Sequence, residues 1–299
     1  MSSELTRRDF IAGLLAASVP LAKPLSAARE GAILAAAETA DPAESARAAI
    51  EALGGISRFV KPGQSVMLLP NPQGRSKGVS TRPELVEEAV KLCLGAGASK
   101  VEVCSIHSMG RWQGTGIDEA ARRAGAEVWT PGFKDWVTLE VKNSRIQRQV
   151  KIVTPVLERD VLINMPIAKH HGSTRFTGAL KNLMGVNSGN AGWHAGTDYL
   201  AGSIVDLASV VQPQLCLIDA TEILAENGPF GPGRIATPNK VVAAVDPVAA
   251  DAYCCRLLDM KPEEVATVRE AARRGLGKMR LEKVSSLRQR RVQLYRGVD

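Results

Sequence analysis

The chain has 299 residues, of which 45% are hydrophobic and only 4% aromatic, and its formal net charge is +7. This length supports one large or two small domains with a substantial core, and the composition is that of a globular protein rather than a disordered chain or a membrane bundle. The basic excess lies near the C-terminus with Tyr295 as its one aromatic residue. Nucleic-acid binding is therefore not expected, because it calls for aromatic residues interleaved with the basic ones.

The first element in chain order has the pattern of an export signal. Arg7 and Arg8 precede a mildly apolar run from Phe10 to about Ala22, and small residues follow. The run is shorter than the ~20 residues that span a bilayer, and paired arginines before such a run are typical of twin-arginine export. A cytosolic amphipathic helix is the alternative. We expect residues 1–40 to be a twin-arginine signal and linker, the twin-arginine translocase to be a partner, and the protein to reside in the periplasm or another extracytoplasmic compartment.

From residue 41 onward, helix-like and strand-like segments alternate. Helices are predicted at 42–55, 81–98, 114–126, 203–212, 247–258 and 261–275. A further helix is predicted after the paired histidines and ends at Leu183. Strands are predicted at 64–70, 100–106, 127–130, 159–166, 214–220 and 240–246, with a hairpin-like excursion over 135–154. This alternation is typical of an α/β fold with an open, mostly parallel sheet flanked by helices. We expect residues 41–299 to form a single domain whose basic C-terminal extension is a helix with a solvated face.

Polar segments follow five of the predicted strands. They cover residues 71–78, 107–112, 167–171, 220–233 and 246–251. Ligands of open α/β sheets bind outside the carboxyl ends of the strands. We therefore expect a site for a small-molecule ligand where these five segments meet.

The four histidines of the chain all lie in or near these segments. His107 follows a predicted strand, and His170 and His171 stand side by side after another. Neighbouring residues of an extended segment point in opposite directions, so only one of the pair is expected to face the site. His194 lies in a glycine-rich segment beside Trp193. Converging histidines could serve as acid and base or hold a transition metal; a surface position for His107 and packing against Trp193 for His194 are the alternatives.

The segment after the paired histidines resembles an anion site. Thr174 and Thr177 precede a predicted helix, Gly178 permits close backbone approach, and Lys181 and Asn182 lie in the first turn. Helix N-termini with Ser or Thr caps bind anions readily, although capping alone explains part of the pattern. We expect these five residues to bind a substrate or cofactor.

Carboxylates and cysteines complete the candidate groups. Glu226, in a loop rich in glycine and proline, and Asp246, before a predicted helix, are further ligand-binding candidates. Asp206, Asp219 and Asp251 could add oxygen ligands for a cation, with helix capping as the alternative. None of the five cysteines forms a C-x-x-C pair, so no iron–sulfur cluster is expected.

Three stretches of sequence resemble a known family. They are VLINMPIAKHHGSTRFTGALKNLMG, CLIDATEILAENGPFGPG and VVAAVDPVAADAYCCRLL. Together they are similar to the DUF362 family, a family of unknown function, over about residues 64–277. Many relatives carry ferredoxin-type cysteine motifs that this chain lacks, so it resembles the exported subset.

The order of these motifs is also distantly similar to the N-terminal domain of nickel-pincer lactate racemases. The matching positions are Asn71 with Arg75, His107, His171 with Gly178, Lys181 and His194. In that family two histidines act as acid and base on opposite faces of the substrate, a lysine carries the cofactor and a later histidine ligates nickel. The resemblance implies these roles for His107 with His171, Lys181 and His194. Asn71 replaces an acidic residue, and Ala179 and Leu180 follow Gly178 where the racemases have paired glycines.

These observations favour an exported enzyme acting on a small anionic substrate. His107 and His171 are the expected acid–base pair, Arg75 and Lys181 the expected anion- or cofactor-binding residues, and His194 a candidate ligand of nickel or another transition metal. Isomerase- or racemase-like chemistry and oxidoreductase chemistry both fit. The alternative is a periplasmic protein that binds a small ligand or a cofactor without turnover.

Overall fold

The computed structural model describes residues 31–107, 109–287 and 291–299. The predicted twin-arginine motif at Arg7 and Arg8 lies outside the described residues. Within them, no helix is both long and apolar enough to cross a membrane.

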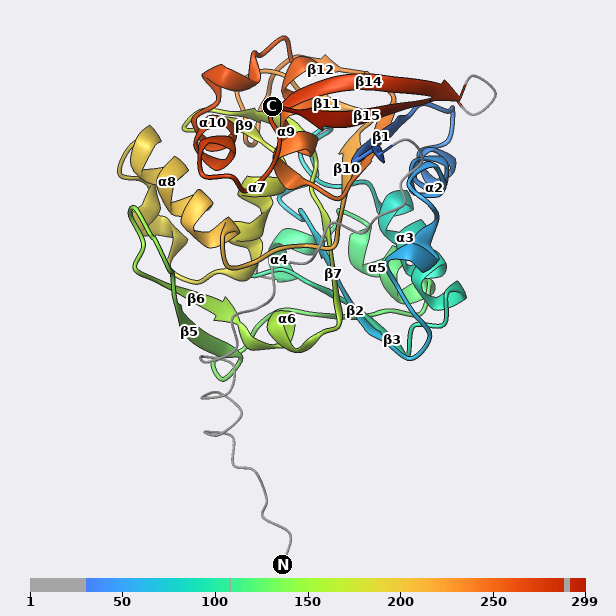
Figure 1. The fold of residues 1–299 in the computed structure, drawn as a ribbon. Helices are drawn as coiled ribbons and strands as arrows, with labels where there is room; N and C mark the ends of the chain where they lie inside the picture. The colour runs from blue at the N-terminus through green and yellow to red at the C-terminus, as the bar shows by residue number, and fades with distance from the viewer. Residues whose placement is uncertain (1–30, 108, 288–290) are drawn as a thin grey trace, which may run out of the picture.

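A nine-stranded sheet forms the centre of the molecule (Figure 1). Its order is β14-β15-β1-β13-β10-β7-β2-β3-β4. The strands β10, β7, β2, β3 and β4 run parallel, and β13, β1, β15 and β14 add an antiparallel half. Their bounds are β1 Leu34–Ala37, β2 Ser65–Pro70, β3 Lys100–Cys104, β4 Glu127–Trp129, β7 Val161–Met165, β10 Leu215–Ala220, β13 Lys240–Ala244, β14 Arg280–Leu287 and β15 Val292–Val298. The predicted α/β fold with a parallel core is confirmed.

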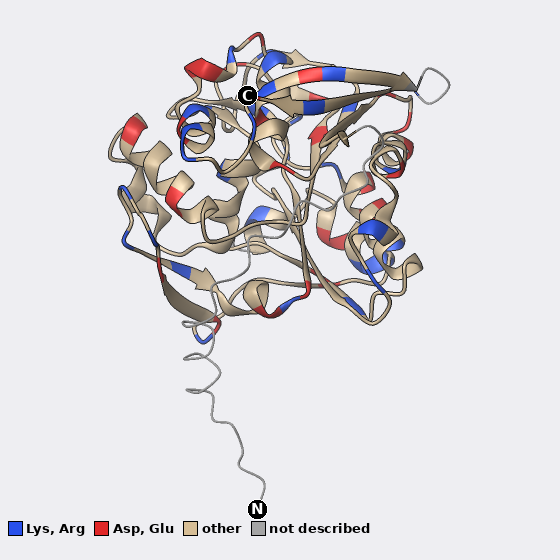
Figure 2. Ribbon diagram, viewed as in Figure 1, with Lys and Arg blue, Asp and Glu red and all other residues tan. Residues whose placement is uncertain are grey.

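Helices cover both faces of the sheet because the inner strands are apolar on both sides. On β10, Leu217 packs into one hydrophobic cluster and Ile218 into the other. One layer contains α2 Pro42–Ala52, α3 Pro83–Gly95 and α5 Ile117–Arg123. The other contains α7 Ala179–Asn182, α8 Thr197–Ala208, α9 Pro247–Arg256 and α10 Ala266–Arg273 (Figure 1). Acidic and basic residues are spread over these helices, the connecting loops and the strands β14 and β15 (Figure 2).

Shorter elements connect these layers. The short helices are α4 Met109–Trp112, α6 Thr154–Glu158, η2 Ile56–Arg58, η3 Leu183–Val186, η4 Asn190–His194 and η5 Pro262–Glu264. The two-stranded hairpins pair β5 Trp136–Glu140 with β6 Gln149–Val153, β8 Lys169–His171 with β9 Arg175–Thr177, and β11 Ile223–Leu224 with β12 Ile235–Ala236. The hairpin predicted over 135–154 is thus present as β5 and β6.

Both ends of the described chain differ from the prediction. Leu34–Ala37, predicted as linker, is the buried strand β1 between β13 and β15, so the folded domain begins before residue 41. The basic tail, predicted as helical, forms the hairpin β14–β15 after α10. Val292 and Leu294 are buried while Gln293 and Tyr295 are half-buried, a two-residue period that fits a strand and not a helix.

Four of the five predicted strand-end segments follow parallel strands, and the fifth does not. Because β13 runs antiparallel to β10, its carboxyl end lies at the opposite edge of the sheet. Asp246 therefore lies away from the other segments and caps α9, accepting from the backbone N–H groups of Val248 and Ala249. It also accepts from the N–H of Lys278. These bonds explain Asp246 by helix capping, not by ligand binding.

Candidate functional site

A cavity of about 430 Å³ opens at the carboxyl ends of β2, β3 and β7. The loops that follow these strands, together with η4 and the loop after β11, form its walls. Seven of the residues predicted for the site line it: Asn71, His107, His171, Thr177, Lys181, Asn182 and His194. Segments that are more than a hundred residues apart in sequence therefore meet here.

Besides Asp246 and Gly178, three predicted residues lie outside the cavity lining and have partners of their own. Arg75 donates a hydrogen bond from Nε to the carbonyl of Gln113 at 2.9 Å. Glu226 is exposed and pairs with Arg234 at 3.0 Å. The buried hydroxyl of Thr174 donates to a backbone carbonyl two residues further along. None of the three lines the cavity.

The predicted anion site at the start of α7 is filled by the protein itself. The buried carboxylate of Asp251 accepts from the backbone N–H groups of Ala179 and Leu180. A side chain at Gly178 would collide with this carboxylate, so the glycine allows α9 to approach α7. Burial raises the pKa of Asp251 to about 7, against the lowering effect of these two N–H groups. The sequence pattern is that of an anion-binding site, but the group bound there is the carboxylate of Asp251 in the same chain.

Two backbone N–H groups determine which ring nitrogen of His171 carries the hydrogen. Its Nδ1 accepts from the backbone N–H groups of Ser173 and Thr174 at 3.1 and 3.4 Å. An N–H group only donates, so the neutral ring carries its hydrogen on Nε2. His171 can thus donate from Nε2 but cannot accept a proton there while these bonds persist. His170 points elsewhere, and its Nδ1 accepts from the N–H of Gly228 at 3.0 Å.

His107 and His194 supply the nitrogen acceptors of the cavity. Nδ1 of His194 lies 3.1 Å from the carbonyl oxygen of Asn190 and can only donate to it, which leaves the lone pair on Nε2. Nδ1 of His107 lies 2.7 Å from Oγ of Ser105, a hydroxyl that can either donate or accept. The His171 and His194 rings are 6.5 Å apart, centroid to centroid. Among these three histidines, one is therefore a fixed donor and two are able to accept a proton.

Burial and nearby cations keep His107 and His171 neutral. Burial, with smaller contributions from Arg111, Lys169 and Lys181, lowers the pKa of His107 to about 4. Burial and the same two lysines lower the pKa of His171 to about 3. A bound anion would offset the lysine charges and raise both pKa values toward the usual range.

Two lysines give the cavity its positive charge. Lys181 lines it, and its ammonium lies 3.5 Å from Sδ of Met184, with no carboxylate partner among the described residues. Burial lowers its pKa to about 8. Lys169, which the sequence did not single out, is fully buried behind the wall, and burial followed by the charge of Lys181 lowers its pKa to about 7. It lies two residues from His171 on β8, a spacing that places both on one face.

Three asparagines form a chain of hydrogen bonds that begins at Lys169. The Asn71 amide donates to Oδ1 of Asn182 at 3.0 Å, and the Asn182 amide donates to Oδ1 of Asn164 at 2.8 Å. Asn164 in turn donates to the carbonyl of Ala179. Asn182, predicted to bind ligand, thus has its amide engaged within the protein and orients α7, which carries Lys181.

The metal prediction can be compared with the ligands available. Among the described residues, no group of three or more His, Cys, Asp or Glu side chains is placed to hold a metal ion. Asp206 and Asp219 accept backbone N–H groups, and all five cysteines are buried thiols. The Nε2 lone pair of His194, in the same cavity as Lys181, fits a cofactor that brings most of its own metal ligands. It does not fit a bare ion held by the protein alone.

Comparison with known proteins shows a matching family and two proteins to which the chain is similar. The model of the family described as Domain of unknown function (DUF362) matches residues 66–256. Thylakoid-associated protein sll1697 of Synechocystis sp. (strain ATCC 27184 / PCC 6803 / Kazusa) is 28% identical over 247 residues, 78% of this chain and 74% of that protein. The lactate racemase apoprotein from Thermoanaerobacterium thermosaccharolyticum superposes with a TM-score of 0.47 at 11% identity, covering 78% of this chain. This chain spans 57% of that racemase chain.

Proposed function

We propose that this chain, which belongs to the DUF362 family, is an enzyme that binds a small organic anion and moves a proton on it. The observation that carries the proposal is the charge of the cavity. Lys181 lines it, Lys169 lies directly behind its wall, and no carboxylate is among its described lining residues. A buried cation without a counter-charge is costly, and a bound anion supplies that counter-charge. The favoured ligands are small carboxylates.

The histidines have complementary roles in this proposal. Nε2 of His171 donates a hydrogen bond to an oxygen of the bound anion, and this bond stabilises negative charge that develops during the reaction. His107 takes the proton, because its Nδ1 can donate to Ser105 and leave Nε2 free. His107 becomes a better base once the anion offsets the lysine charges. A second base on the opposite face, such as His194, would give isomerase- or racemase-like chemistry.

Exchange with solvent deuterium tests this function without knowledge of the substrate. The protein is incubated in D2O with a pool of small 2-hydroxy and 2-amino carboxylates, and loss of carbon-bound proton signals is followed by NMR. We expect exchange in one member of the pool, and loss of that exchange in His107→Asn and Lys181→Met. Lys142→Met, an exposed lysine outside the cavity, is the control. Carboxylate binding without any exchange would favour the alternative, a binding protein without turnover.

A cofactor-dependent form of the same reaction has its own support. Lys181 and the free Nε2 of His194 line one cavity, an arrangement that suits a metal-containing cofactor such as a nickel-pincer group. Such a group would supply an electrophilic centre next to the substrate. Metal analysis of protein purified from its native host under anaerobic conditions tests this directly. Stoichiometric metal that is lost in His194→Ala and retained in His170→Ala would support it, and metal-free protein with full exchange activity would refute it.

We also propose that the twin-arginine translocase exports the protein to the periplasm. The support is the sequence around Arg7 and Arg8. Fractionation of cells that express the wild type and an Arg7→Lys, Arg8→Lys double variant tests it. Retention of the double variant in the cytoplasm is expected, and equal export of both would contradict the proposal.

A further inference from the structure

Lys169 is buried beside the cavity without lining it. It is fully inaccessible to solvent, and its ammonium donates to the carbonyl oxygen of Val79 at 2.6 Å, to Oε1 of Gln73 at 2.8 Å and to Oδ1 of Asn71 at 3.4 Å. All three acceptors are neutral. The ammonium is therefore fully hydrogen-bonded, but no described residue neutralises its charge.

These bonds fix the orientation of the Gln73 amide. An ammonium has no lone pair, so Oε1 must face Lys169 and Nε2 must face away from it. No described residue accepts a hydrogen bond from this Nε2, and Gln73 lines the cavity. Gln73 was not among the residues expected from sequence, because nothing local marks its amide as oriented.

A second polar atom in the same wall lacks a partner. Thr177 is the cross-strand neighbour of Lys169 in the β8–β9 hairpin and lines the cavity. Its buried hydroxyl has no hydrogen-bond partner in the described part of the chain. A buried polar group without a partner destabilises the protein, and a ligand oxygen can accept the missing hydrogen bond after rotation of the side chain. This wall thus contains two hydrogen-bond donors, Nε2 of Gln73 and the hydroxyl of Thr177, that have no acceptor among the described residues.

We propose that Lys169 is a positioning residue that makes the cavity selective for fully ionised oxyanions. It acts through Gln73, whose oriented N–H groups bind the anion together with the ammonium of Lys181, while its own buried charge attracts the anion. The inference rests on the proposed function only in taking the ligand to be a small anion. A neutral amide can accept hydrogen bonds from this wall but lacks the negative charge that Lys169 and Lys181 attract, and an ammonium group, which only donates, would be rejected.

The near-isosteric variant Gln73→Glu separates this role from a purely structural one. A glutamate at this position pairs with Lys169, so the melting temperature should rise. The same carboxylate neutralises Lys169 and repels anions, so acetate and inorganic phosphate should bind at least about tenfold more weakly. Binding is measured by isothermal titration calorimetry on the full chain, and Gln212→Glu, an exposed position, is the control.

The possible results overturn different statements. If the wild type binds neither acetate nor phosphate, the proposed function fails together with this inference. If the wild type binds and Gln73→Glu binds equally well, only the role of Lys169 fails. A lower melting temperature in Gln73→Glu would likewise overturn the role of Lys169, because its charge would then already be compensated.

Discussion

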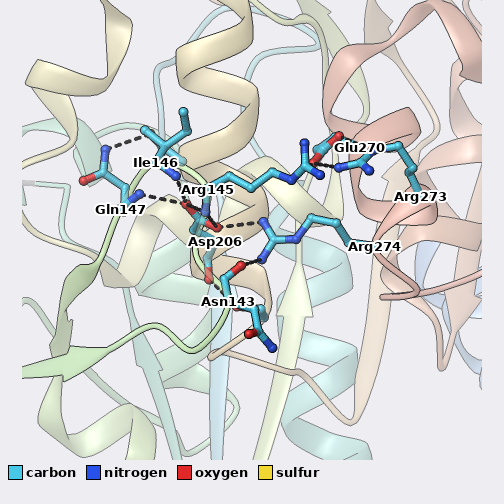
Figure 3. Close-up of polar contacts among 10 residues, drawn as sticks. Asn143, Arg145, Ile146, Gln147, Asp206, Glu270, Arg273 and Arg274 are labelled. Carbon is cyan, nitrogen blue, oxygen red and sulfur yellow. Dashed lines mark hydrogen bonds and ion pairs between the residues drawn. The ribbon is translucent and has the colours of Figure 1, made fainter.

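Two regions of the molecule bury charge in opposite ways. At Asp206 on α8, a fully buried carboxylate accepts from the backbone N–H groups of Arg145, Ile146 and Gln147 and pairs with Arg274 at 2.7 Å (Figure 3). This set, the Asp206 cluster, joins the loop between β5 and β6 to α8 and to the end of α10. In the cavity, Lys169 is equally buried but has only neutral acceptors.

The difference separates stability from function. A buried charge with a full set of partners holds elements together, and removal of one partner leaves the others unpaired. A buried charge without a counter-ion destabilises the free protein and is relieved when an anion binds. Both regions contain residues that a sequence reading marks only as polar or charged. We therefore expect variants of the Asp206 cluster to change stability alone, and variants of the cavity lysines to change anion affinity and pH dependence.

The largest effect is expected from Asp206→Ala. This change leaves three backbone N–H groups and the mostly buried guanidinium of Arg274 without their acceptor. The free energy of unfolding should fall by about 3–5 kcal/mol, as measured by urea denaturation. Asp198→Ala, an exposed aspartate on the same helix, is the control and should cost less than about 1 kcal/mol. Weaker acetate binding in folded Asp206→Ala protein would show that the two regions are coupled. The Asp206 cluster would then affect function as well as stability.

A smaller effect is expected in the pH dependence of stability when Lys169→Met is compared with the wild type, and its sign can be derived. The pKa of Lys169 is lowered from 10.5 to about 7 by burial and then by Lys181. At any pH between these two pKa values the unfolded chain binds more protons than the folded chain does. The wild-type free energy of unfolding therefore rises with pH in this window. From about pH 7 to about pH 9 the wild type should gain about 2 kcal/mol relative to Lys169→Met.

Chemical denaturation at both pH values measures this gain, and Lys142→Met should show no such difference from the wild type. A constant difference between the wild type and Lys169→Met would mean that Lys169 keeps an ordinary pKa. Its charge would then be compensated like that of the Asp206 cluster.

The sequence predicted the parallel core because its strands and helices alternate with clear periods. It missed β1 because Leu34–Ala37 is a short alanine-rich segment that continues the composition of the region before it. The presence of His171 and Lys181 in one cavity could be predicted because they lie in one short segment after one strand. The bonds of Lys169 to Gln73 and Val79, and of Asp251 to α7, join residues at least 71 positions apart. No local pattern encodes such contacts, since they depend on how the strands are ordered in the sheet.

The smallest expected effect is spectroscopic and concerns His171. Its Nδ1 accepts backbone N–H groups, and burial and the lysines lower its pKa to about 3. The chain has four histidines, so the ring nitrogens can be resolved by NMR of 15N-labelled protein. We expect His171 to stay neutral with its hydrogen on Nε2 from about pH 8 to about pH 5. Its signal, assigned with His171→Asn, should shift on addition of acetate in the wild type and much less in Lys181→Met. A hydrogen on Nδ1 of the neutral ring would contradict the donor role, and titration near the usual histidine pKa would contradict the expected neutral state. A hydrogen on Nδ1 would also remove this donor from the cavity, because Nε2 would then offer the ligand a lone pair, which repels an anion.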